Sequence, residues 1–453
     1  MRVALYLLLI LGLAAIPGSV LPQRPVSPRE VGLYLQEHSA AGAVLDRLGL
    51  FDVYGSVWFS AVYLLLVVSL IGCIIPRTPK HIRDWRNAPT SPPKSSDSAL
   101  ELVGVDLASL AAALRGGRVS RGDGYVLWRV GLLKETSNLV FHAALLAALL
   151  AVGVGSSLGY RGQVLVREDK TFTNQVGEYD TLKVGRFAGD DALPEFSLTL
   201  DDLAVTYNAS GPSVGTASDY AAHVTYLQAG GTARAFTIGV NSPLDVANSS
   251  VFLVGHGYAP ELVVRDSSGA EVFNDTVVLL PTDSSFDSSG VLKVPGLSPQ
   301  LGVDLQLLPT ADTALGQSVF PALLDPVLNL IVRRGDLGDL SAQSPYQLNH
   351  TGLKVAGAFV LRPGETLKLA DGSTLEFVGV KEYATFNVAS DPGQMWALAF
   401  ALLAITALAG MLLLRRRTYW FVEAGGAVVV HGFGATADSD LASVRALLSE
   451  EPR

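Results

Sequence analysis

Residues 139–158 read LVFHAALLAALLAVGVGSSL, an apolar run without Asp, Glu, Lys or Arg. A helix needs about 20 predominantly apolar residues to cross about 30 Å of hydrocarbon. Three further stretches of similar length, at 3–20, 57–75 and 395–414, have the same apolar character. The sequence therefore predicts an integral membrane protein with four transmembrane α-helices.

The first stretch has a second interpretation, a cleaved signal peptide. Arg2 precedes its apolar run, as in a secretory signal, but no A-x-A-like cleavage site follows. Pro17-Gly18-Ser19, near its end, makes a poor site. We therefore expect residues 1–20 to remain as the first transmembrane helix.

The composition excludes several classes of protein. Hydrophobic residues make up 49% of the 453 residues and charged residues only 17%, against about 25% charged residues in an average soluble domain. The single cysteine, Cys73, cannot form an intramolecular disulfide, a CxxC redox pair or a CxxCH haem-attachment motif. The net charge of -9 gives no reason to expect a nucleic-acid partner, because such proteins usually show a basic patch.

The distribution of Lys and Arg predicts the topology. Residues 76–138 hold ten of them and residues 415–453 begin with three consecutive arginines, whereas residues 21–56 hold three. Because cytoplasmic loops carry the excess of Lys and Arg, we expect a multi-pass protein of the plasma membrane with both termini, the 76–138 loop and the 415–453 tail in the cytoplasm. The short 21–56 loop and residues 159–394 would then lie outside. This outer segment has a net charge of -13.

Residues 159–394 have the pattern of a large β-rich domain. Short apolar runs with alternating polar residues are separated by Gly, Pro, Asn, Asp and Ser, as in FSLTL at 196–200. Asp371-Gly372 lies between two such runs and predicts a hairpin turn. A short helix is expected only around residues 321–331. The predicted fold is thus four transmembrane helices plus one extracytoplasmic β-rich domain.

The two cytoplasmic segments are expected to form small structures. Apolar residues recur at helical spacing in 99–115, which predicts a short amphipathic helix. In the tail, a strand-like run at 427–430 precedes a helical pattern that reaches residue 448. Neither segment is large enough to be an enzyme.

The candidate chemistry is sparse. The chain contains no GxGxxG, Walker P-loop or HExxH motif. Cys73, near the inner end of the second span, is expected to be a small packing residue. His142 lies near the start of the third span, and an ionisable side chain at that depth is often functional.

Two interpretations of His142 remain open from the residues alone. Imidazole is a common axial ligand of haem iron, and a partner chain would have to supply the second ligand. Alternatively, His142 is an interfacial histidine that either forms a hydrogen bond to a neighbouring helix or snorkels to the lipid headgroups.

Several ordered stretches carry a resemblance to a known family. They are PGSVLPQ at 17–23, SLIGCIIPR at 69–77, FH at 141–142, FSLTLDD at 196–202, VNSPL at 240–244, GHGYAP at 255–260 and DPG at 391–393. With the four-span layout, they make the chain resemble ResB, also called CcsB, of system II cytochrome c biogenesis, in its actinobacterial form. The likeness covers nearly the whole chain.

The resemblance implies a haem-handling role. Proteins of this family pair with a ResC/CcsA-type membrane protein, move haem outward and present it to the CxxCH thiols of apocytochrome c. Carried over by position, the family's haem ligand is His142, so haem would bind transiently between this chain and its partner. His256, within the GHGYAP stretch, is a second candidate contact for haem or apocytochrome.

The same resemblance limits what the chain can do alone. The family's Trp-rich haem motif belongs to the partner, and a thioredoxin-like reductant would reduce the apocytochrome thiols. We therefore expect a non-autonomous component of a cytochrome c synthetase, with no catalytic residue of its own assigned. The alternative is a membrane-anchored β-domain that acts as a sensor or assembly scaffold without haem.

Overall fold

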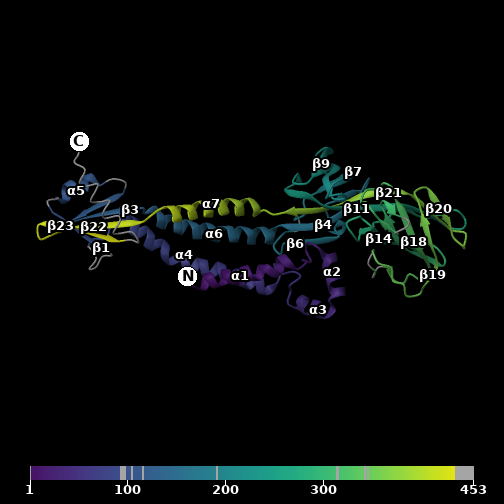
Figure 1. Cartoon of the computed structure of the whole chain (residues 1–453), viewed down its shortest axis with the longest axis horizontal. Coiled ribbons are helices and arrows are strands. Elements are labelled where there is room, and N and C mark those ends of the chain that lie inside the picture. Colours follow the sequence, from purple (N-terminus) through teal and green to yellow (C-terminus); the bar gives the residue numbers. More distant parts are fainter. Residues whose placement is uncertain are drawn as a thin grey trace. The chain divides into compact units, whose positions relative to one another are not determined.

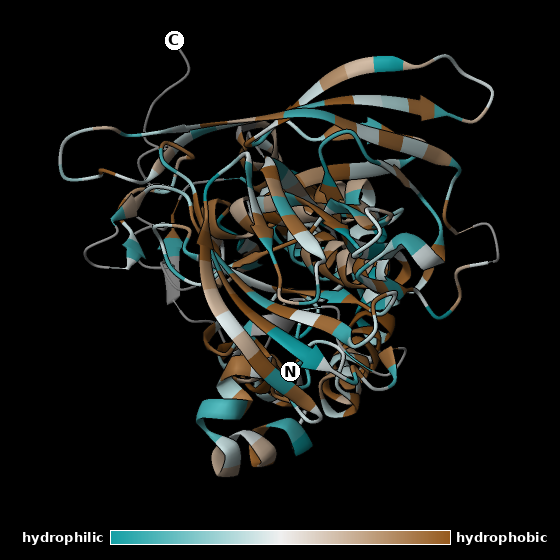
Figure 2. Cartoon of the chain, turned by 90° about the vertical axis from the view of Figure 1, so that its right-hand side faces the viewer, coloured by the Kyte–Doolittle hydropathy of each residue, from teal (hydrophilic) through white to brown (hydrophobic). Residues whose placement is uncertain are grey.

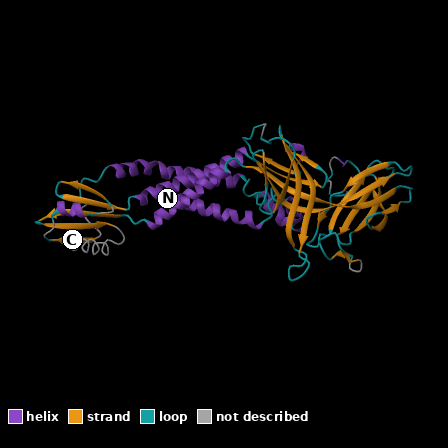
Figure 3. Ribbon diagram, turned by 90° about the horizontal axis from the view of Figure 1, so that it is seen from above, coloured by secondary structure: helices purple, strands orange, loops and turns teal. Residues whose placement is uncertain are grey.

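The chain divides into two compact units in a computed structural model that describes residues 2–91, 98–103, 106–114, 117–189, 192–312, 316–340, 343 and 346–433. The first, which we call the helical unit, comprises Met1–Ser156 and Pro392–Arg453, and the second, the β-rich unit, comprises Ser157–Asp391. Figure 3 distinguishes the helices in purple from the strands in orange. Each unit is described separately below.

The helices of the chain differ greatly in length (Figure 1). They are α1 (Arg2–Val20), α2 (Pro28–Glu37), α3 (Ser39–Arg47), α4 (Val57–Arg86), α5 (Leu107–Ala113), α6 (Leu133–Leu158) and α7 (Gln394–Leu413). Among the described residues, α4, α6 and α7 are long and apolar enough to cross a membrane. The apolar part of α1, Leu5–Val20, is shorter. The described part of the chain therefore has three helices suited to a membrane, and a fourth span at α1 stays a prediction.

Helix α4 extends well past the predicted span at 57–75. It continues through Pro76 and Pro79 to Arg86, although proline removes a backbone donor and usually ends or kinks a helix. The Thr78 hydroxyl donates to the Ile74 carbonyl, 3.0 Å away, within this turn. The extension places residues 76–86 on the same helix as the apolar segment.

The long helices pack through close approaches. The Tyr63 hydroxyl of α4 donates to the Leu149 carbonyl of α6, and the His81 ring lies 3.1 Å from the Thr136 hydroxyl. Since the numbering rises along α4 while it falls along α6, the two helices are antiparallel. A Cβ at Gly410 of α7 would lie 2.7 Å from the hydroxyl oxygen of Ser137. Small residues allow helix backbones to approach in this way.

The helical unit also contains a five-stranded antiparallel sheet in the order β1-β23-β22-β3-β2. Its strands are β1 (Ser98–Leu102), β2 (Arg118–Gly122), β3 (Tyr125–Val130), β22 (Arg417–Ala424) and β23 (Ala427–Phe433). Helix α5 packs on it through Leu110, beside Trp128 and Phe421. The sheet therefore joins the 76–138 loop to the tail that follows α7.

This sheet corrects one local prediction and confirms another. The helix predicted at 99–115 is wrong over its first residues, because β1 pairs with β23 and α5 covers only Leu107–Ala113. The strand predicted at 427–430 is confirmed as part of β23. The helical pattern that ends at residue 448 lies outside the described residues.

Strands are the main elements of the β-rich unit, which confirms the predicted β-rich domain. They are β4 (Tyr160–Arg167), β5 (Thr171–Thr173), β6 (Thr181–Val184), β7 (Phe196–Tyr207), β8 (Ala217–Gln228), β9 (Arg234–Gly239), β10 (Leu244–Val246), β11 (Ser249–Arg265), β12 (Glu271–Thr276), β13 (Leu280–Pro281), β14 (Ser288–Val294), β15 (Gln300–Leu308), β16 (Ala311–Asp312), β17 (Gln317–Ser318), β18 (Val327–Gly335), β19 (Leu353–Leu361), β20 (Glu365–Lys368) and β21 (Thr374–Ser390), with the 3-10 helix η1 (Val176–Glu178).

Two long strands organise the β-rich unit. Strands β11 and β21 pair antiparallel along their length, with bulges at Leu253/Gly255 and Glu261/Leu262. Along one half they pack with β7 and β8 around a core that includes Leu198 and Phe386. Along the other half they pack with β14, β15 and β18 around a second core that includes Leu305 and Phe377. Hydrophobic and hydrophilic residues alternate along many of these strands in Figure 2, as expected for strands with one buried face.

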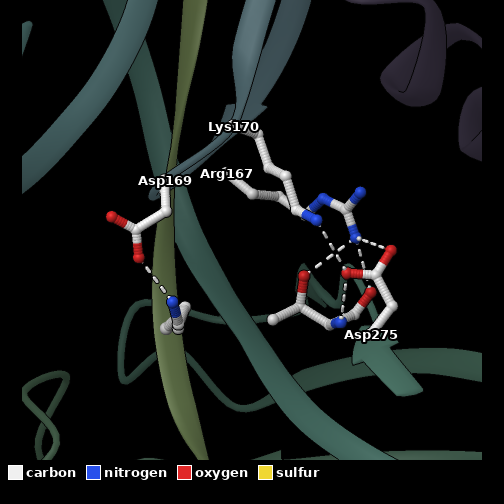
Figure 4. Close-up of polar contacts among 6 residues, drawn as sticks. Arg167, Asp169, Lys170 and Asp275 are labelled. Atoms are coloured by element: carbon white, nitrogen blue, oxygen red, sulfur yellow. Dashed lines mark hydrogen bonds and ion pairs between the residues drawn. The ribbon is translucent and has the colours of Figure 1, made fainter.

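Ionic contacts fix the end of β4 in this unit. Arg167 and Lys170 both point toward Asp275 in Figure 4, at 3.1 and 3.3 Å. Asp169 accepts a hydrogen bond from Lys381 of β21 at 2.5 Å. These contacts connect the turn after β4 to β12 and β21.

Two further local predictions in this unit have different outcomes. The turn predicted at Asp371-Gly372 is confirmed, because β20 pairs with β21 across it and Gly372 has a φ of 83°. The short helix predicted around 321–331 is wrong. Residues 327–331 belong to strand β18, which pairs with β15 and β19 and buries Leu328 and Leu330.

Candidate functional site

A cavity of about 340 Å³ lies between α4, α6 and the segment that leads into β22. Small-molecule sites usually occupy about 300–1,000 Å³. His142, the predicted site residue, lines the cavity. The lining consists of two helix faces and one arginine: Cys73, Ile74, Arg77, Lys80, His81, Asp84, Glu135, Asn138, Leu139, His142 and Arg416.

Helical periodicity brings these residues together. On α4, Cys73, Arg77 and Lys80 follow one another at steps of four and three residues, so they share a face. On α6, Glu135, Asn138 and His142 do the same. Because the helices are antiparallel, the two faces can oppose each other along the cavity.

The ring of His142 is held in a defined orientation. Its Nδ1 lies 2.8 Å from the Asn138 carbonyl oxygen, and a carbonyl can only accept, so Nδ1–H is the donor. The neutral tautomer then has its lone pair on Nε2. Metal-binding histidines usually donate their other ring N–H to a carbonyl or carboxylate in this way. In the neutral ring, Nε2 is therefore the nitrogen that His142 can offer to a metal.

His81 also lines the cavity and was not predicted from the sequence. Its Nε2 is 3.1 Å from the Thr136 hydroxyl, and its Nδ1 is 4.0 Å from a carboxylate oxygen of Glu135. The sequence contains a signal for His81, because His81 is eight residues after Cys73 and falls near the same helix face. This signal holds only if α4 continues through Pro76 and Pro79, and proline usually ends or kinks a helix.

Charged side chains gather at the end of the cavity away from Cys73. Arg416 forms an ion pair with Glu135, and each side chain is 38% exposed. Lys80 and Asp84 of α4 line this part of the cavity, and Arg77 lies about one turn closer to Cys73. The site thus combines an imidazole beside apolar side chains with a cluster of charges.

Two further arginines hold the end of α4 beside this cluster. Arg129 of β3 donates to the Asp84 carbonyl at 2.9 Å, and Arg118 donates to the Trp85 carbonyl. These contacts satisfy carbonyls that a helix end would otherwise leave unpaired. Burial lowers the pKa of Arg129, and the nearby Arg118 and Arg416 lower it further. The site therefore lies beside buried positive charge.

His256, the second predicted contact, lies in different surroundings within the β-rich unit. Its ring stacks on Phe286 with centroids 4.5 Å apart, and Tyr220 lies 5.4 Å away. Its Nε2 is 3.4 Å from the Tyr207 hydroxyl, and its Nδ1 is buried without a hydrogen-bond partner among the described residues. Burial lowers the pKa of His256 to about 4, so the ring is neutral near pH 7. Contact with haem or apocytochrome at His256 stays a prediction.

Glu382 lies near His256 and is the other titratable group of note in this unit. It pairs with Tyr258 across β11 and β21, and one of its carboxylate oxygens is buried without a partner in the described part of the chain. Burial, then the neighbouring Glu168 and Asp202, raises the pKa of Glu382 to about 8. Glu382 is therefore largely protonated at neutral pH.

The comparisons with known proteins agree along the chain. The sequence profile of the ResB-like family matches residues 1–444, so the chain belongs to the ResB-like family. A protein of Gloeobacter violaceus named cytochrome c biogenesis protein CcsB is 28% identical over 260 residues, which cover 54% of this chain and 52% of that protein.

Two relatives from Synechococcus strains carry the same name and match over more of their length. They are 24% and 23% identical, and each match covers 93% of this chain, with 89% and 87% of the relatives covered. These relatives are cyanobacterial, so the expected actinobacterial form is not borne out. The resemblance to the family itself is confirmed.

Proposed function

We propose that this protein is a membrane subunit of a cytochrome c synthetase. With a ResC/CcsA-type partner, it would move haem across the membrane and present it for covalent attachment to apocytochrome c. Membership of the ResB-like family and the name shared by the relatives support a role in cytochrome c biogenesis. Haem is cargo in this proposal and would be held transiently.

The observation that carries the proposal is the orientation of His142 beside a cavity. Its Nδ1 is occupied by the Asn138 carbonyl, so Nε2 is the nitrogen available to haem iron. Ile74 and Leu139 line the cavity next to it and suit an apolar macrocycle. The donor and its surroundings therefore fit one axial ligand of haem.

The proposed topology has four spans, with α1 as the first. Both termini and the sheet of the helical unit would be cytoplasmic, because Lys and Arg are concentrated in residues 76–138 and after α7. The β-rich unit would be extracytoplasmic. The charged end of the cavity would then face the cytoplasm, where haem would enter.

The partners follow from what this chain does not supply. His142 would bind one face of the iron, and a ResC/CcsA-type protein would provide the ligand for the other. The β-rich unit would contact haem or apocytochrome c, with His256 as a candidate contact that does not hold the haem retained in the complex. A thioredoxin-like protein would keep the apocytochrome thiols reduced, because this chain has a single cysteine.

Co-expression with a ResC/CcsA-type partner tests this proposal. The purified complex should show the absorption spectrum of bis-histidine haem, and His142→Ala should lower its haem content by about 100-fold, because the iron loses a ligand. His38→Ala is a matched control, since His38 is exposed and lies outside the cavity lining.

Two results would contradict the proposal. One is an unchanged spectrum and haem content in His142→Ala. The other is a complex that stays colourless while deletion of the protein leaves c-type cytochromes intact. The second result would favour the alternative, a membrane-anchored β-domain that acts as a sensor or assembly scaffold without haem.

A further inference from the structure

The two ends of the cavity differ in chemistry. Along α4, Cys73 lies at the apolar end and Lys80 is seven residues further, about 10 Å along the helix axis. Along α6 the order is reversed, with His142 at the apolar end and Glu135 about 10 Å away. An imidazole and a group of cations therefore lie at opposite ends of one cavity.

The cations reach the cavity from two directions. Arg77 and Lys80 are three residues apart on one face of α4, so their side chains are neighbours. Arg416 comes from the segment between α7 and β22. The Lys80 side chain makes no hydrogen bond or ion pair with any described residue. We call Arg77, Lys80 and Arg416 the basic rim.

Two carboxylates, those of Glu135 and Asp84, line this end and do not balance the three cations of the basic rim. The ion pair between Glu135 and Arg416 is 38% exposed on each side, and exposed pairs of this kind are weak and easily exchanged. Arg129, which is only 3% exposed, lies near Arg416 and has buried Nε and Nη2 atoms without partners among the described residues. The excess positive charge favours an anionic group on the ligand.

We propose that the basic rim binds the carboxylates of the ligand. Two cations on one helix face and a third from another segment can hold two carboxylates at one edge of a flat molecule. A planar, largely apolar dicarboxylate would then place its apolar body beside Ile74 and Leu139. That the molecule is a porphyrin with two propionates rests on the proposed function. The basic rim selects the dicarboxylic acid over its diester. It also determines that the edge of the ligand with the carboxylates enters the cavity last.

The test compares protoporphyrin with its dimethyl ester. The full chain is placed in nanodiscs of neutral phosphatidylcholine, and binding of the two metal-free porphyrins is followed by fluorescence. The wild type should bind the diacid about ten-fold more tightly than the diester, since charge-assisted hydrogen bonds are lost in the ester. The double variant Arg77→Gln/Lys80→Gln should lose this preference, and Glu135→Gln should increase it. Arg83→Gln is the matched control on the same helix, outside the cavity lining.

The outcomes separate this inference from the proposed function. Equal binding of the diacid and the diester by the wild type would overturn the proposed role of the basic rim, even if His142→Ala abolishes the haem spectrum. An intact haem spectrum in His142→Ala would overturn the ligand assignment, while a preference for the diacid would still support the rim. A preference for the diacid that Arg77→Gln/Lys80→Gln leaves unchanged would also overturn the rim, whatever the lipid.

Discussion

His142 and His256 are both half-buried histidines, and their surroundings give them different capacities. The Nδ1 of His142 is satisfied by a backbone carbonyl, and its ring lines a cavity with charged groups at the far end. The ring of His256 stacks on Phe286, and its Nδ1 is buried without a partner in the described chain. An oriented ring beside a cavity can accept a ligand, whereas a ring among aromatic side chains contributes mainly to packing.

The comparison shows that the partner of Nδ1 determines whether the Nε2 atom of a histidine is available to a ligand. A hydrogen bond at Nδ1 fixes the tautomer of His142 and leaves Nε2 for a ligand. For His256, a ligand would have to reach a ring surrounded by Tyr207, Tyr220 and Phe286. We therefore expect substitutions of His142 and of His256 to have different effects.

The largest expected effect separates the two histidines directly. In the complex with a ResC/CcsA-type partner, His142→Ala should reduce haem content by about 100-fold. His256→Phe keeps a planar ring against Phe286 and should change haem content by less than about two-fold. Pyridine haemochrome assays of both purified variants measure the difference. Similar losses in the two variants would break the comparison and place His256 on the path of haem.

The next effect concerns packing around His256. Phe286→Ala removes the ring stacked on His256 and should lower the free energy of unfolding of the β-rich unit by about 2 kcal/mol. Calorimetry of the full chain in detergent measures it, and haem content should stay at the wild-type level. Phe187→Ala is the control, because Phe187 is 72% exposed. Equal stability of the two variants would show that the ring pair does not support the fold.

The pH dependence of stability should reside in the β-rich unit. The pKa of Glu382 is raised to about 8, so the unfolded chain loses its proton first and stability falls as pH rises from about 4.5 through 8. The pKa of His256 is lowered to about 4, so stability falls as pH decreases from about 6.5 through 4. Between pH 6 and 8, the titration of Glu382 should lower the free energy of unfolding by about 1–2 kcal/mol.

Calorimetry across this pH range tests both arms. Glu382→Gln should flatten the alkaline arm, and His256→Phe should flatten the acidic arm. If both variants keep the wild-type pH profile, these two buried groups do not govern the stability of the unit.

The smallest effect concerns the support of the His142 region. Gly410→Ala places a Cβ 2.7 Å from the Ser137 hydroxyl oxygen, so this hydroxyl must rotate away or α7 must move from α6, at an expected cost of about 1 kcal/mol. Gly12→Ala is the control, since a Cβ there meets no atom within 4 Å. Haem content should fall only slightly in Gly410→Ala. A Gly410→Ala variant as stable as the control would show that the approach of the two helices is not tight.

Much of the fold could be predicted because its signals are local. Continuous apolar runs identified α4, α6 and α7, and alternating short runs identified the β-rich unit. The sheet of the helical unit could not be predicted, since it pairs β3 with β22 across almost 290 residues of sequence. The strand at 327–331 was mistaken for a helix, because short apolar runs fit either period.

The candidate site was predictable only in part. His142 stood out as an ionisable residue in an apolar run. His81, Arg77 and Lys80 lie beyond the span predicted at 57–75. Because proline usually ends or kinks a helix, the continuation of α4 through Pro76 and Pro79 could not be expected. Arg416 joins the site through the tertiary fold alone. Sequence thus identified the imidazole, while the charged end of the cavity required the structure.

Chemical rescue tests the central claim most directly. In the co-purified complex, His142→Gly removes the imidazole and leaves space for a free one. We predict that this variant is depleted of haem and that added imidazole, together with haem, restores the bis-histidine absorption spectrum. Two results would contradict the assignment of His142 as an axial ligand. One is a variant that keeps this spectrum without imidazole. The other is a variant whose spectrum imidazole fails to restore although the haem site of the partner remains loaded.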